Sequence, residues 1–500
     1  PGAALVNLTQ TPIVAYPTLA AKFDDWGGAS KQMLRALGDV RRGMGRKEVL
    51  SYAKGKAHPS LPANLTAEER LAFEAWTLAG ARDVTRAHNL AGIGDTDSLQ
   101  NNPVFNRSMG VISSAFHMAE VVNRDVTLLA SYRLARLKGQ GHAQAVTSAD
   151  KVTTDSHLDY SNANRARYMQ GNTAKLLLMF RSYSQGITYL LARSVFQAVK
   201  GEKPAVRREA RQRLAGVLGM TFAFSGAVGM PMLGVGYAVA NMVAALFGDD
   251  DEPWDAETEF RGFLHQALPA PLAASIDRGP VNALTGLDFA SRVSLNELWI
   301  RTPNRDLDGA GLYQHIVEQL IGPIGGIASS PFTAADQLQE GHYHRALEAM
   351  SPKFVRDGLK AMRYAEDGVT TRRGDSVLPA DEDLGAWGLV WQGMGLSPDK
   401  VRAAWETTNM LKNYERHVID RRRTLQSAIA LGIIEGDTEA VGDLMPRVRA
   451  WNAKMPEELR INSRTVRASV QSRQRYSEKA QSGVVLLPGL EDLRERVGVR

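Results

Sequence analysis

The residues best suited to chemistry stand in one short run, residues 155–165 (DSHLDYSNANR). His157 could act as a general base, and Asp159 could orient it. On a helix, side chains two positions apart point in different directions, so this pair would need a loop to meet. Further polar side chains follow at Tyr160, Ser161, Asn162, Asn164 and Arg165. They could complete an active site, or they could form a hydrogen-bonded junction between helices, which we favour.

The other candidates for catalysis or metal binding are weaker. His342 and His344 would share a face only in a strand, and no third ligand follows at a metal-binding spacing. The Gly-rich residues 92–95 have neither a preceding strand nor a following Lys-Ser/Thr, so they do not form a phosphate loop. The chain contains no Cys, which excludes disulfides, thiolate zinc sites and Cys nucleophiles. We therefore predict no catalytic residue, no cofactor and no metal site.

The elements that would carry these side chains are helical. Of the 500 residues, 44% are hydrophobic and 23% charged, which is ordinary for a folded chain and excludes wholesale disorder. Apolar residues recur at helical spacing over Phe23–Leu37, 111–138 and 172–199. Thr66 followed by Glu69 is typical of a capping box at a helix start. Alternating strand patterns are almost absent, so the sequence predicts an all-α chain of many helices.

The first residues are an expected exception to this helical pattern. Residues 5–20 (LVNLTQTPIVAYPTLA) contain Pro12 and Pro17, which restrict the residues before them to extended conformations. We predict an extended segment lying in the groove of another element. The fold class is thus all-α, an extended multi-helix assembly of helical hairpins with an extended amino-terminal segment.

The segment Leu214–Phe247 is 34 residues long and has no charged side chain. A single membrane span needs about 20 residues, so the segment is long for one span and short for two. Pro231 divides it, and each half suits one limb of a helical hairpin. Small residues four apart (Ala215, Gly219, Ala223; Ser225, Gly229) would let helices approach closely in lipid. Basic residues precede the segment and acidic ones follow it, as the positive-inside rule expects.

Three environments suit this hairpin: permanent residence in a membrane, burial in a large protein assembly, or burial first and membrane exposure later. The candidate residues for membrane insertion are Leu214, Gly219, Ala223, Phe224, Gly229, Pro231, Tyr237 and Phe247.

The positive charge is concentrated at the carboxyl-terminal end. Residues 401–500 hold 18 Lys and Arg against 13 Asp and Glu, which accounts for five of the six net positive charges. Such residues form either a solvated helix face or a surface that contacts a nucleic-acid backbone without reading its sequence. The candidates for backbone contact are Arg421, Arg422, Arg423, Arg447, Arg449, Arg464, Arg467, Arg473 and Arg475.

Several long motifs resemble one family. Residues 155–193 (DSHLDYSNANRARYMQGNTAKLLLMFRSYSQGITYLLAR) resemble a block of the PLxRFG-type proteins, very large polyvalent proteins of tailed phages and prophages. Residues 246–264, 277–299 and 473–489 are similar to further parts of these proteins. The family's Pro-Leu-x-Arg-Phe-Gly string is missing, and the nearest run, residues 102–107 (NPVFNR), is not a match. The chain also opens on Pro1 without a charged region typical of a signal peptide. Together these features suggest the C-terminal part of a longer polypeptide.

The resemblance implies a virion protein that is stored in the capsid interior or near the portal and tail and is ejected with the genome into the host envelope. Its implied partners are other copies of itself, other ejection proteins, portal or tail proteins, the genomic DNA backbone and the host inner membrane. The alternatives are an enzyme of the cell wall or nucleic acid centred on His157–Arg165, and a passive portal-plug or packing protein.

The chain is expected to divide into five regions. They are an N-terminal extended segment with helices (1–104), a helical block with the DSHLDYSNANR motif (105–202), an apolar hairpin with charged flanks (203–265), a Gly/Pro-punctuated helical region (266–400) and a basic helical region (401–500).

Overall fold

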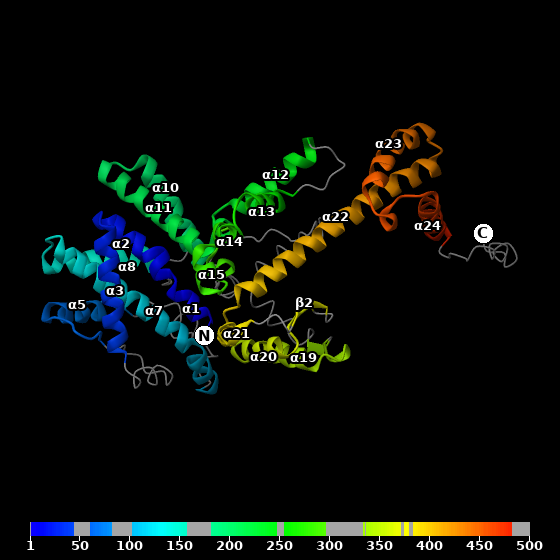
Figure 1. The fold of residues 1–500 in the computed structure, drawn as a ribbon. Coiled ribbons are helices and arrows are strands. Elements are labelled where there is room, and N and C mark those ends of the chain that lie inside the picture. The colour runs from blue at the N-terminus through cyan, green and yellow to red at the C-terminus, as the bar shows by residue number, and fades with distance from the viewer. Residues whose placement is uncertain are drawn as a thin grey trace. The chain divides into compact units, whose positions relative to one another are not determined.

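Helices dominate the protein, as Figure 1 shows. The computed structural model describes residues 2–44, 61–82, 103–157, 182–247, 255–296, 334–335, 337–371, 375–379 and 384–482. The described strands, β1 (Val369–Thr370) and β2 (Ser376–Leu378), pair antiparallel. The predicted all-α class is confirmed. The chain divides into two compact units, each made of two stretches of sequence. The first unit contains Pro1–Gly236 and Arg261–Trp405, and the second contains Tyr237–Phe260 and Glu406–Arg500.

The described helices of the first unit fall into two stretches of sequence. The first stretch contains α1 (Gly2–Leu8), the π-helix η1 (Thr11–Ala15), α2 (Tyr16–Phe23), α3 (Trp26–Gly43), α5 (Ala67–Leu78), α7 (Pro103–Leu137), α8 (His142–His157), α10 (Ser182–Lys200), α11 (Pro204–Ser225) and the 3-10 helix η6 (Ala227–Gly229). The second contains α14 (Ala270–Arg278), α15 (Pro280–Thr285), α16 (Ala290–Val293), α19 (Tyr343–Met350), α20 (Lys353–Glu366) and α21 (Gly385–Gly393).

The predicted extended conformation of residues 5–20 is wrong, because α1, η1 and α2 cover most of this segment. Pro12 and Pro17 each lie in the first turn of a helical element. Proline is tolerated there because the first backbone N–H groups of a helix have no intrahelical acceptor. Leu19 and Ala20 are fully buried, so the segment belongs to the core of the first unit.

That core lies where α3, α5, α7 and α8 pack together. Phe73 and Trp76 on α5 meet edge to face, and Trp76 in turn meets Tyr132 on α7 edge to face.

The predicted capping box is confirmed: Glu69 N donates to the Thr66 hydroxyl, and Thr66 N donates to the Glu69 carboxylate. The predicted helix over 111–138 is α7, which ends at Leu137. Of the predicted helix over 172–199, residues 182–199 lie in α10, and the rest lie outside the described residues.

The apolar segment Leu214–Phe247 is helical on both sides of a break at residues 226–232. The main partners of α11 are α10 and α2. A Cβ on Gly219 would meet open space. A close approach occurs one turn earlier, where a Cβ on Gly216 would lie 2.5 Å from the Trp26 ring and 2.7 Å from Pro17 Cβ.

A second close approach joins the end of α11 to the turn between α14 and α15. Gly226 and Gly279 both have positive φ, at 61° and 95°. A Cβ on Gly226 would lie 2.3 Å from the Asp277 carbonyl oxygen, so no side chain fits there.

Three helices continue from one unit into the other: α12 (Leu233–Phe247), α13 (Ala256–Ala267) and α22 (Asp399–Glu435). In the second unit, the start of α13 contacts α12, because the Asn241 amide bonds both Asp255 and Ala256 N. The carboxyl-terminal half of α22 packs with α23 (Thr438–Lys454), the 3-10 helix η7 (Glu457–Leu459) and α24 (Ser463–Ser482) (Figure 1). The core of this three-helix bundle includes Leu425, Val448 and Trp451.

The two glycines on α11 provide a matched test of this packing. We expect Gly216→Ala to destabilise the protein by about 1–3 kcal/mol, because its methyl group would overlap the Trp26 ring. We expect Gly219→Ala, one turn away, to stabilise it by about 0.5–1 kcal/mol, because Ala is the better helix former. Urea unfolding followed by tryptophan fluorescence measures both. Equal effects of the two substitutions would contradict the packing of α11 on α2 and α3.

Candidate functional site

His157, the candidate general base, lies in the protein interior. It is the last residue of α8, and its side chain is 3% exposed. Its Nε2 lies 2.7 Å from the hydroxyl of Thr127, a fully buried residue of α7. The His157 ring thus joins α7 to α8, as a side chain at a helix junction does.

The surroundings of His157 oppose its protonation. Burial, together with the nearby positive charge of Arg124, lowers its pKa to about 3, against a weaker opposing effect of a backbone hydrogen bond with Asn123. The ring is therefore neutral at physiological pH, and it is closed off from solvent. A general base needs contact with its substrate, so His157 is unsuited to that role. The other residues of the run, Asp159, Tyr160, Ser161, Asn162, Asn164 and Arg165, lie outside the described residues.

The two histidines of α19 do not form a metal site with other described residues. His342 precedes the helix and His344 lies on its exposed surface. In the described ranges, no three His, Cys, Asp or Glu side chains come close enough together to hold a metal ion.

The membrane-insertion candidates are spread over α11, η6 and α12. Leu214, Ala223, Pro231 and Tyr237 are half-buried, Gly219 is exposed and Gly229 is buried. Phe224 packs edge to face on Phe289, and Tyr237 contacts the Phe260 ring. Phe247 is the last residue of α12. Among the described helices, none combines the length and the apolar character that crossing a bilayer requires.

The outer surface of α12 is nonetheless apolar. Val235, Val239 and Val243 recur every four residues along this helix, and each is about half exposed. Met232, just before the helix, is 70% exposed. A row of aliphatic side chains in water is typical of a surface that another apolar partner covers.

The predicted DNA-contact residues all lie on α22, α23 and α24. Arg421, Arg422, Arg447, Arg473 and Arg475 are half-buried, and Arg423, Arg449, Arg464 and Arg467 are exposed. Arg423 lies 3.4 Å from Asp420, and Arg449 Nε donates to the Met445 carbonyl at 3.4 Å. Arg464 and Arg467 are one turn apart on α24. The structure thus places the exposed cations on one three-helix bundle, where they remain accessible to a polyanion.

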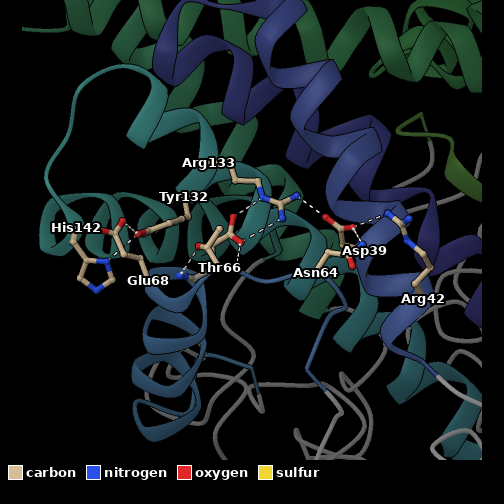
Figure 2. Close-up of polar contacts among 9 residues, drawn as sticks. Asp39, Arg42, Asn64, Thr66, Glu68, Tyr132, Arg133 and His142 are labelled. Carbon is tan, nitrogen blue, oxygen red and sulfur yellow. Dashed lines mark hydrogen bonds and ion pairs between the residues drawn. The ribbon is translucent and has the colours of Figure 1, made fainter.

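Arg133 is the centre of a polar network in the first unit, shown in Figure 2. From α7, its guanidinium donates to Asp39 on α3 at 2.7 Å and to Glu69 on α5 at 2.6 Å. Asp39 also accepts from Arg42 at 2.7 Å and from Asn64 at 3.3 Å. Since Glu69 is the capping-box residue, the network ties the start of α5 to two other helices.

The same face continues through Tyr132 (Figure 2), whose hydroxyl lies 2.8 Å from His142 Nδ1 and 3.4 Å from Glu68. Burial and the Glu68 charge raise the pKa of Tyr132. Burial alone would raise the pKa of Asp39, but hydrogen bonds from Arg133 and Asn64 outweigh this effect and lower it. Burial likewise disfavours the Arg133 charge, but Glu69 and Asp39 more than compensate and raise its pKa. The ion pair of Arg133 and Asp39 is therefore held in its charged form.

Arg278 occupies a comparable position within residues 277–299, one of the motifs on which the family resemblance rests. It is buried, and it bonds Asp399 at 2.7 Å and Asp288 at 3.2 Å. Asp288 also accepts from Ser291 N, and Asp399 N donates to the Gly286 carbonyl. Sequence reasoning missed Arg133 and Arg278, because Asp39, Glu69 and Asp399 lie far from them along the chain. The central roles of these two arginines are structural.

Comparisons of the chain with known protein families, with curated proteins and with solved structures find no match.

The buried histidine predicts a specific pH dependence. Its pKa is about 3 in the folded state and about 6.5 when unfolded, so the unfolded state takes up the proton first as the pH falls. The stability that neutral His157 contributes is therefore complete above pH 6.5 and decreases towards pH 3, by at most about 1.4 kcal/mol per pH unit. In His157→Gln, we expect a smaller loss of unfolding free energy between pH 7 and pH 4.5.

Urea unfolding at a series of pH values measures this loss. His344→Gln, an exposed substitution on α19, is the control and should keep the wild-type slope. An unchanged slope in His157→Gln would show that the buried ring does not control the acid response.

Proposed function

We propose that the chain is a structural protein of a phage virion that leaves the particle with the genome. It contributes to a portal- or tail-associated assembly, or to a conduit that carries DNA across the host envelope. The observation that carries the proposal is the resemblance of residues 155–193, 246–264, 277–299 and 473–489 to the PLxRFG-type phage proteins. The proposal assigns no catalysis to this chain.

The helical architecture supports passage through a narrow tail. Consecutive helices contact each other at α7–α8, α10–α11, α14–α15 and α20–α21. Contacts that are local in the sequence form quickly, so such a chain can unfold and refold with little delay. The absence of Cys fits a protein that moves from the virion to the periplasm, since no thiol can be trapped by oxidation.

The bundle of α22, α23 and α24 supports contact with the genome. Arg423, Arg464 and Arg467 are exposed there and could meet phosphates without reading bases. Such contacts weaken steeply with salt and carry no sequence preference, which suits a surface past which DNA moves. The partners we propose are further copies of this chain, other ejection proteins, portal or tail proteins, and the genomic DNA backbone.

The apolar surface of α12 supports contact with the host inner membrane after ejection. Val235, Val239 and Val243 are exposed at helical spacing in a helix without charged residues. Burying such side chains in lipid is favourable, at about 25 cal/mol per Å² of apolar surface. The enzyme alternative loses support because the His157 ring, its proposed general base, is buried and neutral.

The first test measures how many copies of the chain each purified phage particle contains, before and after DNA release is triggered. Quantitative mass spectrometry with the major capsid protein as internal standard provides the count. We expect the chain in filled particles and its loss from emptied ones. Full retention in emptied particles would favour the passive portal plug, and absence from filled particles would contradict the proposal.

A pair of variants separates the membrane contact from particle assembly. Val239→Glu places a charge on the exposed surface of α12, and Leu411→Glu places one on an exposed position of α22. We expect both variants to be packaged, but only Val239→Glu to reduce DNA delivery and association with host membranes. Equal infectivity of the two phages would contradict the role of α12.

A further inference from the structure

A cavity of about 490 Å³ lies between the amino-terminal end of α3 and the carboxyl-terminal end of α7, within the first unit. Its volume falls in the range of about 300–1,000 Å³ that is typical of small-molecule sites. Its lining combines three cations, one carboxylate, one amide and two leucines. Neither the virion role nor the polar network of Arg133 accounts for it.

The amide in this cavity belongs to Gln32. The residue is 4% exposed, yet its side chain makes no hydrogen bond with any other described residue. Because Gln32 lines the cavity, its donor and acceptor are available to a molecule that enters.

The cations lie around the opening. Lys31 and Arg35 are exposed, one turn apart on α3, and neither pairs with a carboxylate in the described part of the chain. Lys138, at the end of α7, lies 2.8 Å from Asp25. The Asp25 carboxylate also accepts from Gly28 N at 2.7 Å, so its charge is already engaged as the cap of α3. Three cations against one carboxylate make the lining positive overall, so the cavity favours an anion.

Two leucines of α7 also line the cavity. Leu134 is buried, and Leu137 is 68% exposed beside the opening. Inorganic phosphate would leave Leu137 uncovered and the Gln32 amide without a partner. A larger molecule with an anionic end and a flat or apolar body would use all three features.

We propose that this cavity binds a phosphate monoester of nucleotide size. The phosphate contacts Lys31, Arg35 and Lys138, and the organic body lies against Leu137. The Gln32 amide bonds a heteroatom of that body. Free nucleotides and the 5′-phosphorylated end of a nucleic-acid strand share this chemistry. The proposal does not depend on the ejection function.

Isothermal titration of the full chain with AMP, adenosine and inorganic phosphate, at fixed ionic strength, tests it. We expect AMP to bind, and adenosine and inorganic phosphate to bind at least about tenfold more weakly. The absence of AMP binding would overturn the proposal. Inorganic phosphate binding as tightly as AMP would also overturn it, because the organic body would then make no contact.

Two double variants with the same loss of charge locate the site. The double variant Lys31→Gln with Arg35→Gln should weaken AMP binding about tenfold. The single variant Gln32→Met should weaken AMP binding more than it weakens the binding of inorganic phosphate. Arg41→Gln with Lys151→Gln, exposed residues outside the cavity, should change AMP binding less than about twofold. Equal losses in both double variants would show general charge attraction and overturn the site.

A short oligonucleotide with a 5′-phosphate, compared with its 5′-hydroxyl form, identifies the source of the ligand. Binding of only the phosphorylated form, with the affinity of AMP, would assign the cavity to strand ends. Binding of AMP without either oligonucleotide would assign it to free nucleotides.

Discussion

Buried arginines paired with carboxylates on other elements are the constraint on which the packing of the first unit depends. The pairs are Arg82 with Asp125, Arg133 with Asp39 and Glu69, Arg278 with Asp288 and Asp399, and Arg363 with Glu348. A guanidinium cannot shed its proton in a protein, and an unpaired buried charge costs several kcal/mol. Each arginine therefore accepts only arrangements that bring its carboxylates to it, and this requirement selects the register of the helices.

This division of roles suits a protein proposed to leave a virion. Hairpins such as α7–α8 form from neighbouring segments, and ion pairs such as Arg133–Asp39 and Arg278–Asp399 join segments that are far apart in sequence. Because the contacts between these segments rely on ion pairs rather than on disulfides, they can break and form again without redox chemistry. The second unit uses a different scheme, since an apolar core around Trp451 holds its three helices and leaves arginines such as Arg464 at the surface.

Local features of this fold could be predicted from the sequence, and long-range ones could not. The capping box of Thr66 and Glu69 and the helix α7 follow from spacing within a few turns. The helices at residues 2–23 were missed because proline was taken as a helix breaker, although each proline stands in a first turn. The partners of Arg133 and Arg278 lie 94 and 121 residues away, at Asp39 and Asp399, a separation that no local pattern reveals.

The most direct test of this account compares two arginines one turn apart on α7. Arg133, whose side chain is 16% exposed, lies between two buried carboxylates, and Arg136 pairs with the half-exposed Glu68 at 3.0 Å. Urea unfolding at neutral pH measures the effect of replacing each with Gln. The account predicts a loss of about 3–5 kcal/mol for Arg133→Gln, because two buried carboxylates lose their partner, and less than about 1 kcal/mol for Arg136→Gln. Equal small losses for both would show that buried ion pairs do not determine the packing.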